Sequence, residues 1–254
     1  MGECLGREQL QDVGKLDPDR TVWTSADGVS EWTPHKLETA ESLLALTCAP
    51  DNSLWVAGSY STLLNSSDGG NSWDEQSLEE DAQLSAIQFV DESTGFAAGE
   101  FGLIAKTTDG GLQWEVAGFI PDEFYPQGVW FRNAEQGWVT GLSGTIMRTD
   151  DGGANWEVEE SSTAAPLYQV GLVQLKDQQI RYALGDHSTL LLSQAASGSE
   201  WGRSAVSRSP LYFADALQVD GALVIVGGGG AVHRIDLAQL PAGADINLTS
   251  EGGM

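Results

Sequence analysis

Positive charge is scarce in this chain. Its 254 residues include 12 Lys plus Arg against 37 Asp plus Glu, which gives a formal net charge of −25. Such a field repels nucleic-acid phosphates and anionic lipid headgroups, so the sequence predicts no nucleic-acid partner. The charge favours solubility, cationic partners or a salty environment, and its plainest interpretation is a heavily solvated acidic surface.

Cysteine and histidine are nearly absent as well. Cys4 and Cys48 are the two cysteines, too few for a disulfide framework. A single pairing stays open, but two free thiols are the favoured interpretation. The three histidines, His35, His187 and His233, lack the spacing of metal ligands. The sequence therefore predicts no metal site and no cofactor.

Long hydrophobic runs are also missing. No run approaches 18 apolar residues, and residues 1–20 lack the apolar core of a secretory signal. The sequence thus predicts no direct insertion into a membrane. A chain already cut at a processing site would look the same.

A repeat occupies most of the chain. Residues 58–73, 99–114 and 141–156 each read as a glycine, a short apolar run, a Ser/Thr-x-Asp-Gly-Gly turn and a tryptophan, and residues 185–201 form a weaker copy. Successive repeat tryptophans, from Trp32 to Trp201, are 41, 41, 42 and 45 residues apart. A period of about 40 to 45 residues is typical of propeller blades, each a four-stranded unit.

The apolar runs within one repeat predict its strands. In the second full copy, residues 84–90, 95–99, 103–107 and 114–117 are expected to be strands one to four. Short, nearly continuous apolar runs indicate sheets buried on both faces, as in blades stacked around an axis. The predicted fold is all-β: a β-propeller of four-stranded antiparallel blades, with the repeat turn between strands three and four.

The limits of the domain and the number of blades follow from the same count. Residues 1–20 are expected to be an N-terminal tail, residues 21–240 a single propeller and residues 241–254 a C-terminal tail. The last repeat lacks a fourth strand, which the segment after Trp32 would supply by closing the ring. This count favours five blades and leaves six open.

The repeat turn has the pattern Ser/Thr-x-Asp-x-Gly-x-x-Trp, known as the Asp-box or bacterial neuraminidase repeat. Its Asp accepts hydrogen bonds from backbone N–H groups of its own turn, a glycine takes a positive φ, and the Trp donates its indole N–H. We interpret these residues as structural and not as metal ligands or acids, because a catalytic carboxylate is needed once. The structural residues are Ser66, Asp68, Gly70, Trp73, Thr107, Asp109, Gly111, Trp114, Thr149, Asp151, Gly153 and Trp156.

Residues 95–114 and 137–156 carry a narrower pattern than a generic Asp-box. They read Gly-x-x-Gly-x-Ile-x-x-Thr-x-Asp-Gly-Gly-x-x-Trp or close to it, after a Gly-Trp-x-x-Gly-like strand. This text resembles the photosystem II assembly/stability factor-like β-propellers, over roughly residues 32–236. In phototrophs such proteins are non-enzymatic assembly chaperones for a reaction-centre subunit. Bacterial relatives without a photosystem include exported proteins that accompany membrane transport proteins.

The resemblance implies a non-enzymatic scaffold or assembly factor that binds a protein partner in bacterial membrane-complex biogenesis or transport. Such a partner would be a membrane protein or transporter. The phototroph proteins carry an arginine-rich patch, whereas the arginines here are scattered, so a non-photosynthetic bacterial member fits better. The implied compartment is the periplasm or cell envelope if a signal was removed; otherwise the sequence indicates none, and it leaves the oligomeric state open.

The alternative is a sialidase-like glycan-binding or glycoside-hydrolase propeller. Sialidases share the turn motif, but their site needs three arginines around a carboxylate, a Tyr–Glu pair and a Phe/Tyr-Arg-Ile-Pro stretch. The nearest text is residues 131–134, FRNA. Glycosidase chemistry also needs two facing carboxylates, and no pair stands out among so many acids. The sequence therefore favours a protein that is not an enzyme.

The partner is expected at the loops between strands two and three and at the loops between blades. The first kind includes Tyr60, Phe101, Ser143, His187 and Gly229, and the second includes residues 118–127, GFIPDEFYPQ. Aromatic side chains in a proline-stiffened loop suit protein contact, although they would equally cover the top of the core. The predicted partner-binding residues are Tyr60, Phe101, Phe119, Phe124, Tyr125 and His187.

Overall fold

The computed structural model describes residues 14–17, 19–25, 31–175, 178–194, 201–205 and 211–237. Its regular elements are 22 strands and four short 3-10 turns, all within these residues. The predicted C-terminal tail and Cys4 lie outside the described residues. No helix in the described ranges has the length and apolar character needed to span a membrane.

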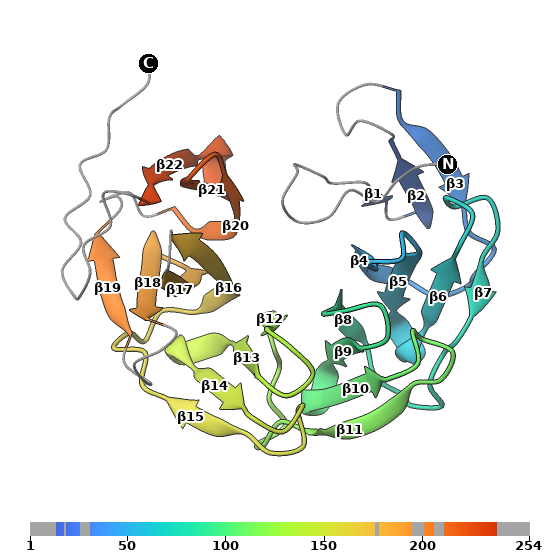
Figure 1. Ribbon diagram of the computed structural model, residues 1–254, viewed down its shortest axis with the longest axis horizontal. Coiled ribbons are helices and arrows are strands. Elements are labelled where there is room, and N and C mark those ends of the chain that lie inside the picture. The colour runs from blue at the N-terminus through green and yellow to red at the C-terminus, as the bar shows by residue number, and fades with distance from the viewer. Residues whose placement is uncertain are drawn as a thin grey trace. The chain divides into compact units, whose positions relative to one another are not determined.

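The chain divides into two compact units. The first comprises the described residues up to Pro126 together with Phe131–Gly137 and Thr149–Trp156, and the second comprises the others. Figure 1 shows the strands of each sheet running side by side, for example β8 to β11 in green.

Three antiparallel sheets belong to the first unit. They are β1 (Gly14–Asp17), β2 (Thr21–Thr24) and β3 (Thr33–Lys36); β4 (Leu43–Cys48), β5 (Leu54–Gly58), β6 (Leu63–Ser66) and β7 (Asp74–Glu75); and β8 (Leu84–Phe89), β9 (Gly95–Gly99), β10 (Leu103–Thr107) and β11 (Glu115–Phe119). In each sheet the strands follow one another in chain order.

Most of the remaining strands belong to the second unit. They are β12 (Gly128–Phe131), β13 (Gly137–Thr140), β14 (Ile146–Thr149) and β15 (Glu157–Glu159); β16 (Leu167–Leu175), β17 (Gln178–Gly185), β18 (Thr189–Gln194) and β19 (Gly202–Ala205); and β20 (Phe213–Val219), β21 (Ala222–Gly227) and β22 (Val232–Asp236). The division between the units passes through the sheet β12–β15, whose repeat turn lies in the first unit.

The predicted all-β class and the repeated four-stranded antiparallel sheet are confirmed. This arrangement is the one expected of a β-propeller. The second strands explain the apolar runs of the repeat, because every residue of β5, β9 and β13 is buried. A strand buried on both faces has no polar alternation to show in its sequence.

The N-terminal segment differs from the expectation. Thr33–Lys36, the strand after Trp32, pairs with Thr21–Thr24 and so does not complete the last sheet. Gly14–Asp17, inside the expected tail, adds a third strand on the other side of Thr21–Thr24. The pattern gave little warning, because β3 reads TPHK and is largely exposed.

Aromatic side chains fill the core between the sheets β4–β7 and β8–β11. Trp55, Phe89 and Trp114 form a cluster with ring centroids 5.3, 5.6 and 5.8 Å apart. Gly111 admits this cluster, since a Cβ there would lie 2.2 Å from the Trp55 ring. Each buried ring of this kind contributes about 2 to 3 kcal/mol to the free energy of unfolding.

Cys48, at the end of β4, is disulfide-bonded. The expectation of two free thiols is therefore wrong for this residue. Spacing alone did not show the bond, because two distant cysteines reveal nothing about whether the fold brings their Cβ atoms within reach.

Candidate functional site

The turn between the second and third strands has the same backbone shape in sheet after sheet. Its central residue is left-handed, with φ of 53° at Tyr60, 58° at Phe101, 56° at Ser143, 54° at His187 and 67° at Gly229. The conformation costs a non-glycine residue roughly 1 to 2 kcal/mol. Tyr60 and Phe101 occupy it with their side chains 63% and 48% exposed, so two large rings project where glycine would be easiest.

Three of these turns are tied by a backbone hydrogen bond to the connection that leads to the next sheet. In the first unit, Ser61 N donates to Ala82 O at 2.7 Å, and Ile120 N donates to Gly102 O at 2.8 Å. In the second, Ser188 N donates to Leu211 O at 2.6 Å. The backbone therefore holds the exposed central residues in place without help from their side chains.

Two of the predicted residues in the first unit are in direct contact. The Phe101 and Tyr125 rings meet edge to face, with centroids 5.9 Å apart, and Tyr125 is 45% exposed. Tyr60 belongs to the same region, because its neighbour Ser61 bonds Ala82 while Glu100 N donates to Gln83 O at 2.9 Å.

Phe119 and Phe124 are the other two residues of the 118–127 loop that were predicted to bind a partner. Phe119 is 56% exposed at the end of β11, directly before the Ile120 that bonds the Phe101 turn. Phe124 is half-buried, directly before Tyr125. Neither ring contacts another aromatic ring within the described part of the chain.

His187 belongs to the second unit. Its Nδ1 lies 3.1 Å from Asp186 Oδ2, and its side chain is 69% exposed. Tyr168 and Tyr212, which the sequence prediction missed, meet edge to face with centroids 6.1 Å apart. Burial, then the charge of Asp186, raises the pKa of Tyr168. A repeated Pro-Leu-Tyr, at the start of β16 and directly before β20, was the available signal.

The Asp-box carboxylates are bonded inside their own turns. Asp68 Oδ1 accepts from the backbone N–H groups of Asn71 and Ser72, both at 2.9 Å, and from Ser66 Oγ at 2.9 Å. The N–H of Ser72, and then its hydroxyl, lower the pKa of Asp68 to about 2. Bonds of the same kind lower the pKa of Asp109 and of Asp151. These carboxylates therefore stabilise their own turns.

The three Asp-box tryptophans differ in one respect. The Nε1 atoms of Trp73 and Trp156 donate at 3.0 Å to the carbonyls of Gly70 and Gly153 in their own turns. Trp114 Nε1 is buried and has no acceptor in the described part of the chain. Trp114 packs instead against Trp55 and Phe89.

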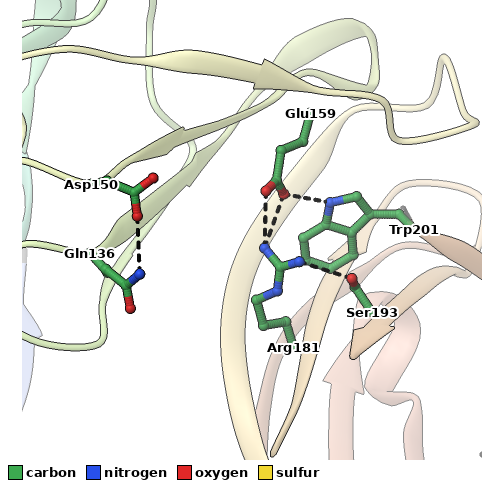
Figure 2. Close-up of polar contacts among 6 residues, drawn as sticks. All are labelled: Gln136, Asp150, Glu159, Arg181, Ser193 and Trp201. Atoms are coloured by element: carbon green, nitrogen blue, oxygen red, sulfur yellow. Dashed lines mark hydrogen bonds and ion pairs between the residues drawn. The ribbon is translucent and has the colours of Figure 1, made fainter. Parts of the chain in front are cut away.

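A buried ion pair lies in the second unit, between β15 and β17. Arg181 Nη1 donates to Glu159 Oε2 at 3.0 Å, and the two residues are 2% and 4% exposed. Figure 2 shows Trp201 and Ser193 completing the cluster: Trp201 Nε1 donates to Glu159 Oε2 at 2.9 Å, and Arg181 Nη2 donates to Ser193 Oγ at 2.9 Å.

Aromatic rings enclose the guanidinium of this pair. Arg181 Cζ lies 4.9 Å from the centroids of both Trp138 and Trp201. Desolvation lowers the pKa of Arg181, and Glu159 opposes that shift. A sialidase requires arginines that face the carboxylate of its substrate. This guanidinium is instead buried and directed inward. The sequence prediction missed this cluster.

A cavity of about 330 Å³ lies in the first unit beside Trp73. Asn71, Glu38, Glu75 and Lys36 are among the polar residues that line it. Within the described ranges, no group of three or more His, Cys, Asp or Glu residues is arranged to hold a metal ion.

Comparison with known proteins gives one family match. The model of a family described as photosynthesis system II assembly factor YCF48 matches residues 24–119 and 119–211. No curated protein matches the chain.

Several solved structures share the fold. One titled "YCF48 bound to D1 peptide" is 21% identical, with a TM-score of 0.62 over 79% of this chain and 67% of that one. U3-55K is 11% identical, with a TM-score of 0.68 over 87% and 72%. A GH74 enzyme of Niastella koreensis is 15% identical, with a TM-score of 0.61 over 82% of this chain but 38% of the enzyme. At these identities the likeness shows the fold alone.

Proposed function

Because the chain belongs to the photosynthesis system II assembly factor YCF48 family, we propose that it is a non-enzymatic scaffold or assembly factor that binds a protein partner. The observation that carries the proposal is the placement of Tyr60, Phe101 and Tyr125. Tyr60 and Phe101 are exposed rings on turns whose backbone is hydrogen-bonded to the neighbouring connections, and Phe101 contacts the exposed ring of Tyr125. Together they form a preorganised contact surface, which lowers the entropic cost of association.

Peptide binding in a similar structure supports this role. The structure titled "YCF48 bound to D1 peptide" holds a peptide on the same fold. The acidic groups of the repeat support the non-enzymatic part of the proposal, because the Asp-box carboxylates are engaged inside their turns. The buried Glu159 is likewise engaged, with Arg181 and Trp201.

The proposed setting is bacterial membrane-complex biogenesis or transport, in the periplasm or at the cell envelope. The partner would be a membrane protein or transporter. This part of the proposal rests on the family and on the net charge of −25. A strongly acidic chain is repelled by anionic lipid and would reach a membrane through a protein.

The test is affinity capture of the tagged full chain from detergent-solubilised membranes of its source organism. Mass spectrometry would identify what remains bound, and an unrelated acidic protein of similar charge would serve as the control for ionic retention. We expect one membrane protein to be retained in stoichiometric amount by this chain and not by the control. Retention of the same proteins by both baits would contradict the proposal.

The second candidate function is glycan binding, favoured by the cavity beside Trp73. An aromatic ring flanked by amide, carboxylate and ammonium groups suits the apolar face and the hydroxyls of a sugar ring. A glycan array probed with the full chain tests this role. Specific binding that is lost in Glu75→Ala but retained in Glu115→Ala, which alters an exposed glutamate, would favour it.

A further inference from the structure

The exposed rings of the first unit lie in a strongly acidic setting. Lys106 is the only Lys or Arg in residues 37–131, and it is turned to other partners: its Nζ donates to Ala134 O at 2.9 Å and lies 5.3 Å from the Phe96 ring centroid. The rings therefore face no lysine or arginine from the stretch that contains them.

Carboxylates accompany each ring. Asp81 is exposed, one position before the Ala82 that holds the Tyr60 turn. Glu100 directly precedes Phe101, and its two carboxylate oxygens accept from Gln83 Nε2 at 3.0 Å and Gln83 N at 3.2 Å. Glu123 is exposed two positions before Tyr125. The first-unit turn surface is defined here as Tyr60, Phe101 and Tyr125 together with Asp81, Glu100 and Glu123.

Among the side chains that the structure describes, Arg20 is a cation that borders this surface at its Tyr60 end. Arg20 donates to Glu41 O at 3.0 Å and also to Ala40 O, while Glu41 Oε2 accepts from Ser59 Oγ at 3.2 Å. The Phe101–Tyr125 pair lies beyond those contacts. A cationic ligand would therefore find its strongest site at that pair.

We propose that the first-unit turn surface binds a basic segment of the partner protein, one in which Lys or Arg alternates with apolar side chains. The inference rests on the proposed function and adds the chemistry of the partner. Aromatic faces attract ammonium and guanidinium groups, and the flanking carboxylates add long-range attraction. Exposed apolar rings are stabilised only when apolar side chains cover them. One segment with both features satisfies the whole surface.

The test is fluorescence anisotropy with the full chain and a labelled peptide in which Lys and Arg alternate with Phe, Tyr and Leu. One control peptide carries Glu at each basic position, and the other carries Ser at each apolar position. We expect the Glu peptide not to bind and the Ser peptide to bind at least about tenfold more weakly. Equal binding of all three peptides would overturn the proposal.

The matched variants distinguish peptide binding at this surface from attraction to the acidic chain as a whole. Phe101→Ser with Tyr125→Ser removes both rings, and Ser143 shows that serine adopts the same turn. Leu112→Ser is the control, because Leu112 is 74% exposed in the Asp-box turn of the same sheet. We expect the double variant to weaken binding at least about tenfold and the control to leave it unchanged. Attraction spread over the whole chain would leave both unchanged and would overturn the proposal. Thermal melts of both variants establish that they are folded.

The same variants distinguish this proposal from the proposed function. A membrane partner captured equally by the wild-type chain and the Phe101→Ser/Tyr125→Ser variant would overturn this surface and leave the scaffold role standing. Loss of that partner from the double variant alone would support both. If the wild-type chain captures no partner, the scaffold role is contradicted, and the peptide assay still decides whether the surface selects basic segments.

Discussion

The tryptophan that ends the repeat is anchored differently in two regions of the molecule. In the turns after β6 and β14, Trp73 and Trp156 donate to a glycine carbonyl three residues earlier. In the sheet β16–β19 the sequence before Trp201 has lost the Asp-box. There Trp201 donates to Glu159, 42 residues away, and Glu159 in turn pairs with Arg181.

The two ways of anchoring the tryptophan differ in how far they depend on the rest of the fold. A bond to a carbonyl of the same turn is local and neutral, and its net contribution is about 1 kcal/mol. A buried carboxylate is stabilised only while its partners stay in place, since removing one leaves an uncompensated charge. In this sheet a long-range contact ties β15 to β17 and to Trp201, where the other four-stranded sheets have an Asp-box turn.

The largest expected effect comes from breaking the long-range contact among Arg181, Glu159 and Trp201. Arg181→Met should lower the free energy of unfolding by about 3 to 5 kcal/mol, because Glu159 stays buried without its counter-charge. Urea denaturation measures the loss. Adding Glu159→Gln should recover part of it, since the amide removes the charge and still accepts from Trp201. Arg132→Met, at an exposed arginine, should change stability by no more than about 0.5 kcal/mol. A double variant less stable than Arg181→Met would contradict this account.

Replacing each tryptophan by phenylalanine compares the anchors directly. Trp201→Phe loses a bond to a charged group, worth about 1.5 to 3 kcal/mol, and Trp156→Phe loses a neutral bond, worth about 1 kcal/mol. Trp114→Phe loses no indole bond to any described residue and keeps much of its ring packing. Unfolding in urea should rank the losses Trp201, then Trp156, then Trp114. Equal losses at Trp201 and Trp156 would show that the charged acceptor adds nothing.

Lowering the pH should destabilise the Asp-box turns, in which the tryptophan is anchored locally. Hydrogen bonds within the turn lower the pKa of Asp68 from the ordinary 3.8 to about 2. A depressed pKa contributes stability that is present above the ordinary value and is lost as the pH falls through the folded value. Melting temperatures should therefore fall between about pH 4 and pH 2. Asp68→Asn should reduce the slope of that fall, whereas Asp74→Asn, at an exposed aspartate outside these turn bonds, should not. Parallel curves for both variants would contradict the assignment.

Salt gives the smallest effect and separates surface charge from the buried pair. At a net charge of −25, screening relieves repulsion, so the melting temperature should rise with salt. The pair Arg181–Glu159 is shielded from solvent, so the difference in melting temperature between the wild-type chain and Arg181→Met should stay the same. Melts unchanged between low and molar salt would count against the charge argument. A difference that shrinks with salt would show that solvent ions reach the pair.

Local pattern made much of the fold predictable. The runs at residues 95–99 and 103–107 were predicted as strands and are β9 and β10, because a strand buried on both faces needs consecutive apolar residues. The loop prediction placed Phe101 and Tyr125 near one another, and their rings are in contact. The pairing of Thr33–Lys36 was missed, since an exposed strand with a proline carries no such pattern.

The sequence by itself determined the period of the repeat, the apolar strands and the turn chemistry, because each depends on residues a few positions apart. Tertiary structure alone decided the bond at Cys48, the partner of Trp201 and the burial of Arg181. These depend on distances between residues far apart in the chain, for which spacing carries no information. The acidic character of the chain was visible in its composition. Only the fold placed three rings among carboxylates and turned the one nearby lysine away from them.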